Sequence, residues 1–595
     1  MTSNEKAVGR PGDVTRLLWL QGFIGAIALG LLVWELGWPV DEVRSLRSEY
    51  VTWALVLLAL LAEAGLVLRD PKQSRLKRNL VIGALILLAG GRFGLERPLR
   101  DWLGDLIHPR TAALTALVIV QMTLIIPVGL RMLRLTRARF LQQAKPGTLF
   151  VASFLFVIVS GTLMLKTPNA TTAGISWLDA AFTSTSAVCV TGLIAVDTET
   201  SFTPQGQLAI LMLIQIGGLG MMTLTYFMVL MVGQGITLRD RAHLGELFSD
   251  ENLGSMGSFV GKIVTLTLAI ETIGAIGIYQ SWAANPPREG TLVWDAVFHS
   301  ISAFCNAGFS TFSAGLADPA TATNRPSQVV VMLLIIVGGL GFAVVNDLPR
   351  LTMHLVTGPL RLAFPHSRRL ARWQISHPVR LQTRLALKTT AVLLVAGTAG
   401  FFFTERWGYS STRFWEGLFN SVTARTAGFN ITDFGTYNFA SIVLMCTLMF
   451  IGGSPGGTAG GVKTTTFAIA LGELGRLIRG HTSLHIGNRR IARDVVERST
   501  ATVVLSVIWV TLAILLVSRA NPELDAVNVT FECFSAFGTV GLSRSMTDDL
   551  APFSKWVIIA TMFAGRVGIL TLVLTMVGNS RPRRYELPDA RLPLN

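Results

Sequence analysis

Long apolar runs alternate with short polar segments along almost the whole chain. Four apolar runs come first, at residues 17–37, 51–68, 79–93 and 111–132. A helix needs about 20 apolar residues to cross the roughly 30 Å hydrocarbon core of a bilayer. The run at 79–93 is short by this measure, and the other three fit. The pattern predicts an N-terminal bundle of about four transmembrane helices over residues 1–146.

From about residue 148 a different unit begins, and it occurs four times. Each unit has a long apolar helix, a short segment of about ten residues, a glycine turn and a second long apolar helix. The turns read VCVTGLI, FCNAGFS, RTAGFN and GTVGLS, with glycines Gly192, Gly308, Gly428 and Gly541. The glycines are 116, 120 and 113 residues apart, a nearly constant period that indicates an internal repeat. We therefore predict four units, at residues 147–237, 238–350, 351–480 and 481–595.

The match between the units extends beyond the glycines. An ungapped comparison places Phe182, Phe298, Leu418 and Phe531 ten residues before them. The second helices share the glycine-bearing motifs IGGLG, VGGLG, IGGSPGG and FAGRVG. A ten-residue helix would be about 15 Å long and could cross only half of the hydrocarbon core. Each short segment should therefore enter the membrane and turn back, surrounded by protein or water.

Composition and charge support a membrane protein of the all-α class. Hydrophobic residues make up 51% of the chain and charged residues 15%, whereas a soluble domain carries about 25% charged residues. The net charge of +15 comes from basic residues between the apolar runs. That distribution is typical of cytoplasmic loops and argues against nucleic-acid binding. It predicts a multi-pass protein of the inner or plasma membrane, with a cytoplasmic N-terminus and glycine turns on the outer side.

The glycine turns could bind a cation through their main chain. Glycine adopts backbone angles closed to other residues, so successive carbonyl oxygens of four turns could face one axis and replace the water shell of K⁺. The negative ends of the short helices would add a favourable potential. Glycine-mediated helix packing is the alternative for one turn, but packing glycines need no common period. The predicted filter residues are Val190, Thr191, Gly192, Asn306, Ala307, Gly308, Thr426, Ala427, Gly428, Thr539, Val540 and Gly541.

The motifs SAVCVTGL, NAGFST, TARTAGFN and GTVGLS resemble the filter loops of the Trk/Ktr/HKT superfamily of cation transporters, most of all the Ktr-type pore subunit. The resemblance covers about residues 148–578 and implies four helix–pore-loop–helix units around one pore. In that family a glycine in all four loops goes with K⁺ preference, and a serine in the first loop appears in Na⁺-preferring relatives. Gly192 therefore favours K⁺ as the transported ion. Whether Na⁺ is an activator or a co-ion stays open.

The same resemblance implies partners. It implies a homodimer of pore subunits and a separate cytoplasmic regulatory subunit that binds nucleotides. The basic loops at 361–384 and 476–498 would accept that subunit, and membrane phospholipid is an alternative partner for them.

The second helix of the third unit contains the sequence FIGGSPGGTAGGVKTTTF. Its glycines and its proline are unfavourable in a helix and should interrupt it. Composition alone predicts a flexible break. The resemblance implies an intramembrane gate below the filter, and GGTAGGVKT does not fit the phosphate-binding P-loop pattern. The predicted gate residues are Gly452, Gly453, Ser454, Pro455, Gly456, Gly457, Thr458, Gly460, Gly461, Lys463 and Arg566.

Two arginines and several acidic residues are further candidates for functional roles. Arg566 lies in the middle of an apolar run, where an arginine costs about 2.5–3.5 kcal/mol. We expect it to face the pore rather than to reach an interface, and the resemblance makes it an electrostatic element of the gate. Arg425 is expected to brace the third loop through carbonyls or an acid such as Glu416. Asp179 and Asp295 are expected to be helix N-caps. Asp197, Asp433, Asp548 and Asp549 would flank the outer mouth.

Two other classes of function are weighed against a passive K⁺ pathway. A sodium-coupled secondary transporter with a central occluded site would need inverted repeats, whereas the charge pattern gives these units the same sense. A membrane enzyme would need paired carboxylates, HExxH or a Ser/His/Asp cluster in the apolar segments, and none appears. The sequence therefore predicts K⁺ uptake and no enzymatic activity.

Overall fold

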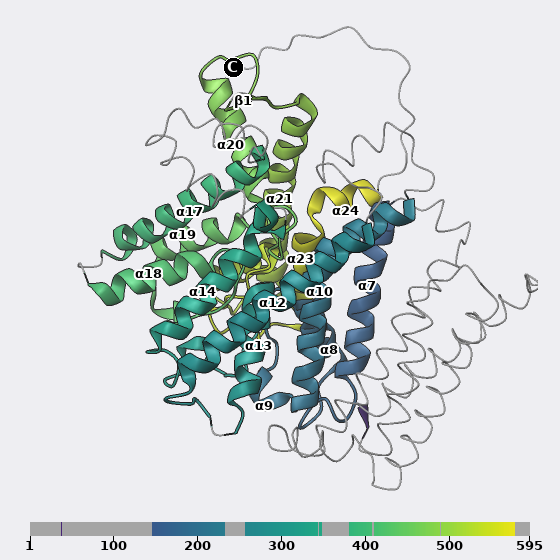
Figure 1. Cartoon of the computed structure of the whole chain (residues 1–595), viewed down its shortest axis with the longest axis vertical. Coiled ribbons are helices and arrows are strands. Elements are labelled where there is room, and N and C mark those ends of the chain that lie inside the picture. Colours follow the sequence, from purple (N-terminus) through teal and green to yellow (C-terminus); the bar gives the residue numbers. More distant parts are fainter. Residues whose placement is uncertain are drawn as a thin grey trace, which may run out of the picture. The chain divides into compact units, whose positions relative to one another are not determined.

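The computed structural model describes residues 37–38, 146–232, 256–347 and 380–576, apart from positions 289, 343, 407–409 and 488. The predicted N-terminal bundle therefore lies outside the described residues, as does most of the basic stretch 361–384. The described helices from α7 onward belong to one compact unit, and the fold below is that of this unit (Figure 1).

The first two repeats each contain a long first helix, a short helix and a long return helix. In the first repeat these are α7 (Pro146–Leu165), α8 (Trp177–Val188) and α10 (Pro204–Val232), with the single turn α9 (Thr198–Ser201) before the return helix. In the second they are α12 (Met256–Trp282), α13 (Leu292–Cys305) and α14 (Arg325–Leu340), with the 3₁₀ turn η2 (Gly315–Ala317).

The third and fourth repeats follow the same order with interrupted return helices. The third has α17 (Leu381–Glu405), α18 (Ser411–Thr423), η3 (Phe434–Thr436), α19 (Phe439–Phe450) and α20 (Thr464–Ile478). An antiparallel hairpin of β1 (His485–Ile486) and β2 (Arg489–Arg490) joins it to the fourth. The fourth has α21 (Arg493–Ala520), α22 (Ala526–Gly538), α23 (Pro552–Val567) and α24 (Ile569–Met576).

Three helices within the described residues are both long and apolar enough to cross a membrane, namely Gly261–Trp282, Leu381–Glu405 and Arg493–Ala520. The pair Pro552–Val567 and Ile569–Thr575 would make a fourth span with a bend of 96°. The short helices have 12 to 14 residues, so each is only about 18–21 Å long. They cannot cross a hydrocarbon core of about 30 Å alone.

The N-caps of two short helices differ from the expectation. Ser176 caps α8 by accepting the N–H of Asp179 at 3.0 Å, and Thr291 precedes α13. Asp179 and Asp295 lie inside the first turns, so the prediction that they are N-caps is wrong. Both carboxylates accept a hydroxyl from the preceding cap residue, at 2.7 and 2.8 Å. A carboxylate in the first turn is stabilised by the helix dipole, which sequence alone does not separate from capping.

The four repeats close into a ring. Each first helix contacts the short helix and the return helix of its own repeat. Each return helix also contacts the short helix of the next repeat: α10 with α13, α14 with α18, α19 with α22, and α23 with α8. The last contact joins the fourth repeat to the first, so the repeats surround one axis in the same rotational sense.

Buried phenylalanines anchor the short helices, and they reveal a shift in the third repeat. Phe182, Phe298 and Phe531 are fully buried, and the equivalent in the third repeat is Phe419, also fully buried. Leu418, which the ungapped comparison selected, is only partly buried. The third repeat is therefore one residue shorter than the other three between the buried phenylalanine of its short helix and its glycine.

The return helices break at corresponding places in three repeats. α14 ends at Gly341 and α23 at Gly568, both with positive φ (82° and 89°). α19 ends at Phe450, and a loop of residues 451–463 precedes α20. The sequence predicted only the break in the third repeat, because IGGLG, VGGLG and FAGRVG do not distinguish a straight helix from a bent one.

Candidate functional site

The glycines of the four turns meet at the centre of the ring. A Cβ atom added to each would fall within 3.0 Å of a carbonyl oxygen in the next repeat. The pairs are Gly192 with Ala307, Gly308 with Ala427, Gly428 with Val540, and Gly541 with Thr191. The contacts form a closed cycle through residues more than 100 positions apart. Side chains are excluded from this point, and main-chain carbonyls surround it.

The four loops also share one backbone conformation. The glycines have φ between 69° and 92°. Two residues earlier, Val190, Asn306, Thr426 and Thr539 have φ between 50° and 70°. Non-glycine residues adopt such angles rarely, so their occurrence at one position in all four loops is a property of the repeat.

A hydroxyl from each short helix fixes the backbone next to the glycine. Ser186 and Ser535 accept the N–H groups of Gly192 and Gly541, at 3.0 and 3.1 Å. Ser302 donates to the carbonyl of Phe309 at 2.7 Å, and Thr423 donates to that of Phe429 at 2.5 Å. These four hydroxyl residues were not predicted from the sequence. They could have been found there, because a serine stands six residues before three of the glycines and a threonine stands five residues before Gly428.

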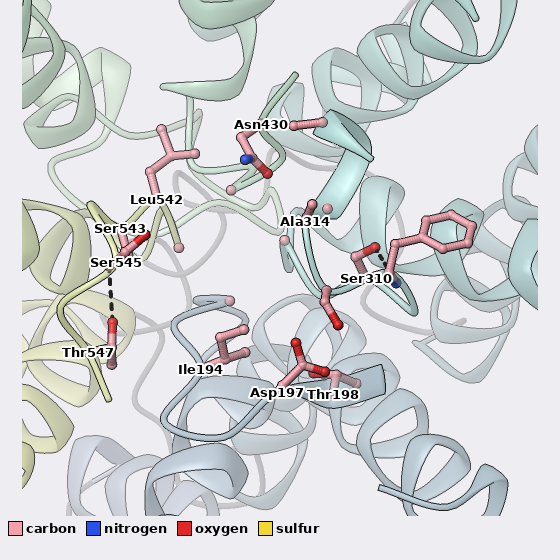
Figure 2. Close-up of a pocket in the computed structure, with 18 of the residues that line it drawn as sticks. Ile194, Asp197, Thr198, Ser310, Ala314, Asn430, Leu542, Ser543, Ser545 and Thr547 are labelled. Atoms are coloured by element: carbon pink, nitrogen blue, oxygen red, sulfur yellow. Dashed lines mark hydrogen bonds between the residues drawn. The ribbon is translucent and has the colours of Figure 1, made fainter. Parts of the chain in front are cut away.

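A cavity of about 430 Å³ opens beside the four glycines, which all line it. Figure 2 shows segments of all four repeats around this cavity, including Ile194, Ser310, Asn430 and Leu542. Three of the four expected acids also line it, namely Asp197, Asp433 and Asp548. Asp549 is not among its lining residues.

The acids of the cavity differ in how tightly they are held. Asp197 accepts the N–H groups of Glu199 and Thr200 at 2.8 and 2.9 Å, and Asp433 accepts that of Gly435 at 2.8 Å. Partial burial raises the pKa of Asp548 above its usual value; nearby Lys555 opposes the rise and the carboxylates of Asp549, Asp197 and Asp179 add to it. The cavity therefore carries negative charge, and burial favours protonation of Asp548.

The loop 451–463 follows α19 and forms hydrogen bonds to the return helices of the second and fourth repeats. Its neck, where Phe450, Ile451 and Gly452 meet Val462, is joined by hydrogen bonds from Gly452 N to Val462 O and from Val462 N to Phe450 O. Further bonds reach the second repeat, from Ser454 N to Gly339 O at 2.9 Å and from Thr458 N to Gly338 O at 3.2 Å.

The remaining predicted gate residues complete this loop. Gly456 and Gly461 have positive φ. Phe342 N donates to Gly456 O, Gly461 N donates to Gly565 O of the fourth repeat, and Gly457 N donates to Ser454 O. Gly453 O accepts Thr464 N, Pro455 lies in the turn, and Gly460 lies against Thr539. Lys463 Nζ donates to Ala459 O at 2.5 Å.

Arg566 holds the loop from the fourth repeat. Its side chain is fully buried, so it does not reach an interface. One Nη donates to Thr458 O and the other donates to Gly217 O at 2.8 Å. In the aligned motifs the first three repeats have Gly218, Gly339 and Gly453 at this position. The fourth repeat therefore carries a cationic side chain where the other three have glycine.

Of the two partners expected for Arg425, the structure shows carbonyls and not Glu416, and it also identifies a partner for Glu271. Arg425 donates to Ile451 O at 2.7 Å and to Gly452 O at 2.5 Å, whereas Glu416 pairs with Arg413. Glu271 accepts the side-chain amide of Gln215 at 3.1 Å and lies 3.8 Å from the Cys305 sulfur. The four cysteines, Cys189, Cys305, Cys446 and Cys533, are buried and free.

Comparisons with known proteins agree with this architecture. A family model described as TrkH, cation transport protein, matches residues 114–581. The potassium/sodium uptake protein NtpJ of Enterococcus hirae is 34% identical, over 77% of this chain and 99% of its own length. The Ktr system potassium uptake protein B of Bacillus subtilis is 33% identical, over 76% of this chain and 97% of its own.

A solved structure gives the same result for the fold. The crystal structure of the potassium transporter TrkH from Vibrio parahaemolyticus superposes with a TM-score of 0.57, covering 83% of this chain and 97% of that one at 18% identity. The curated relatives are named as uptake proteins and not as enzymes. The chain therefore belongs to the TrkH family of cation transport proteins, as a multi-pass membrane transporter similar to the Ktr pore subunits.

Proposed function

We propose that this protein takes up K⁺ along the axis of the ring, through a filter of main-chain carbonyls. The closed cycle of four glycine loops is the observation that carries the proposal. It places carbonyl oxygens of four repeats around one point from which side chains are excluded. Carbonyl rings of this kind replace the hydration shell of K⁺ in selective channels.

The filter would consist of three residues from each repeat. The left-handed residue, the residue after it and the glycine alternate in the sign of φ, which allows successive carbonyls to face one side. The short helices α8, α13, α18 and α22 end three to five residues before the glycines. Their negative ends would lower the energy of a cation at the axis.

The outer cavity would gather cations for the filter. Asp197, Asp433 and Asp548 contribute negative charge within one water-accessible space, and such a space raises the local concentration of cations. The basic hairpin β1–β2 lies at the opposite end of the described helices from α9 (Figure 1). The positive-inside rule then orients the cavity outward, and a cytoplasmic N-terminus follows from the same charge pattern.

The loop 451–463 would be the gate. It would cross the axis below the glycines, and it is held by carbonyl and amide bonds to the second and fourth repeats. Arg566 adds a positive charge at the level where a cation leaving the filter would pass. Opening would require the loop to release Arg566 and the return-helix carbonyls of Gly338 and Gly339.

The proposed assembly is a homodimer regulated by a cytoplasmic nucleotide-binding subunit, with membrane lipid around it. The exposed arginines of the hairpin and of the start of α21 would accept an acidic partner or lipid headgroups. The names of two relatives specify potassium, and one also names sodium. K⁺ is therefore the proposed cargo, with Na⁺ as activator or co-ion. The common rotational sense of the repeats argues against the inverted repeats of an occluded-site, sodium-coupled carrier.

Growth on low K⁺ tests the proposal. Expression of the full chain in a K⁺-uptake-deficient bacterium should restore growth and ⁸⁶Rb⁺ uptake. In liposomes, flux should follow the imposed membrane potential without a Na⁺ gradient. Absence of rescue and of Rb⁺ flux, with and without a regulatory partner, would contradict K⁺ uptake, and flux that requires a Na⁺ gradient would favour the coupled carrier.

A further inference from the structure

One arginine joins the third filter loop to the neck of the gate loop. Arg425 immediately precedes Thr426, the left-handed residue of that filter loop. Its Nη atoms donate to Ile451 O and Gly452 O, the first two residues after α19, at 2.7 and 2.5 Å. These two carbonyls belong to the neck that Val462 closes. A filter loop and the origin of the gate loop thus share one rigid guanidinium.

The Arg425 side chain is buried, and its hydrogen bonds go to these two carbonyls. The side chain is 6% exposed, and it forms no ion pair with a described residue. Its Nε has no hydrogen-bond partner in the described part of the chain. A buried, unpaired guanidinium is costly, so the two neck carbonyls supply its principal stabilisation. Movement of either carbonyl would therefore displace Arg425, the residue that precedes the filter.

The position of Arg425 within the repeat supports the same interpretation. Three residues before the filter glycine, the other repeats have Cys189, Cys305 and Gly538. Only the third repeat has a long cationic side chain there, and the third is the repeat in which the extended loop 451–463 follows the return helix. Simple bracing of a filter loop would be needed equally in all four repeats.

The opposite side of the loop is held by Arg566 through Thr458 O. The gate loop is therefore fixed at its neck by an arginine of a filter loop and at its far arm by an arginine of a return helix. We propose that Arg425 is a positioning residue that couples the gate loop to the third filter loop, so that gate position and ion selectivity are linked. The inference rests on the proposed function, and the linkage is reciprocal because coupling between two sites is a shared free energy.

A double-mutant cycle tests this coupling. The variants are Arg425→Met, Arg566→Met and their combination, prepared as full chains in phosphatidylethanolamine–phosphatidylglycerol liposomes. The readouts are ⁸⁶Rb⁺ flux and the K⁺/Na⁺ permeability ratio from the reversal potential. Loosening the far arm with Arg566→Met should lower the permeability ratio while Arg425 is present. We expect a fall of about tenfold, as for the loss of one hydrogen bond to a charged group.

In the Arg425→Met background, Arg566→Met should raise ⁸⁶Rb⁺ flux but should not lower the K⁺/Na⁺ permeability ratio further. Equal changes of the ratio in both backgrounds, or no change in either, would overturn the coupling, since independent sites add. Arg425→Lys provides a second background: a lysine is a point charge without the planar fork, and it should give an intermediate ratio. It replaces Arg425→Met if the latter elutes as an aggregate. Absence of Rb⁺ flux in the wild-type chain would instead contradict the proposed function.

Discussion

Replacing the first filter glycine by serine tests the filter where the structure leaves least room. Gly192 has a φ of 91°, and an added Cβ would fall within 3.0 Å of Ala307 O and at 3.0 Å from Gly308 Cα. Ordinary contact begins at 3.4 Å, so the loop or the Ala307 carbonyl must move by about 1 Å. Left-handed backbone costs a non-glycine residue a further 1–2 kcal/mol, roughly.

The displaced carbonyl is one of the proposed K⁺ ligands, so selectivity should change more than stability. We expect Gly192→Ser to lower the K⁺/Na⁺ permeability ratio about tenfold, which corresponds to about 1.4 kcal/mol of discrimination. The assay is the reversal potential of the full chain in liposomes under opposing K⁺ and Na⁺ gradients, with ⁸⁶Rb⁺ uptake as the measure of total flux.

Gly174→Ser is the matched control. Gly174 is exposed, has a φ of 78°, and an added Cβ there would meet nothing within 4 Å. It therefore shares the backbone strain of Gly192→Ser without the contact at the axis. A folded Gly192→Ser protein whose permeability ratio equals that of Gly174→Ser would refute the assignment of Gly192 to a filter.

Three further outcomes are expected. Arg566→Gln should raise resting ⁸⁶Rb⁺ uptake several-fold, because it weakens the hydrogen bond that joins Arg566 to Thr458 O of the loop 451–463. Unchanged uptake would argue against a gating role. Because the pKa of Asp548 is raised, lowering the external pH should neutralise this acid and reduce uptake from dilute K⁺. Asp548→Asn should lower uptake at neutral pH and flatten that pH dependence, and an unchanged profile would exclude Asp548 as a contributor. Lys555→Met should destabilise the ring by about 1–3 kcal/mol, because the 2.9 Å ion pair with Asp179 at the contact between α23 and α8 is mostly buried. A melting temperature in detergent equal to the wild type would contradict this.

The sequence by itself determined the repeat and the class of protein. Apolar runs, four glycine turns at a nearly constant period and short segments too short to span a bilayer predict a membrane protein of four hairpin-like units. Composition also predicts the break after Phe450, since glycine and proline are unfavourable in any helix. These features are local, so the chain shows them without knowledge of its packing.

Only the tertiary structure decided which groups meet. An ungapped alignment pairs Leu418 with the phenylalanines of the other repeats, because it does not allow for the one residue missing before Gly428. Burial identifies Phe419 as the equivalent residue. The end of α14 at Gly341 lies against Gly456 and Gly457 of the loop of the third repeat, a contact that the sequence does not show, and glycine is compatible with both a straight and an interrupted helix. The partners of Arg425 are neighbouring carbonyls rather than Glu416. Contacts between residues more than 100 positions apart, such as Gly541 with Thr191, arise only when four separately encoded units close around one axis.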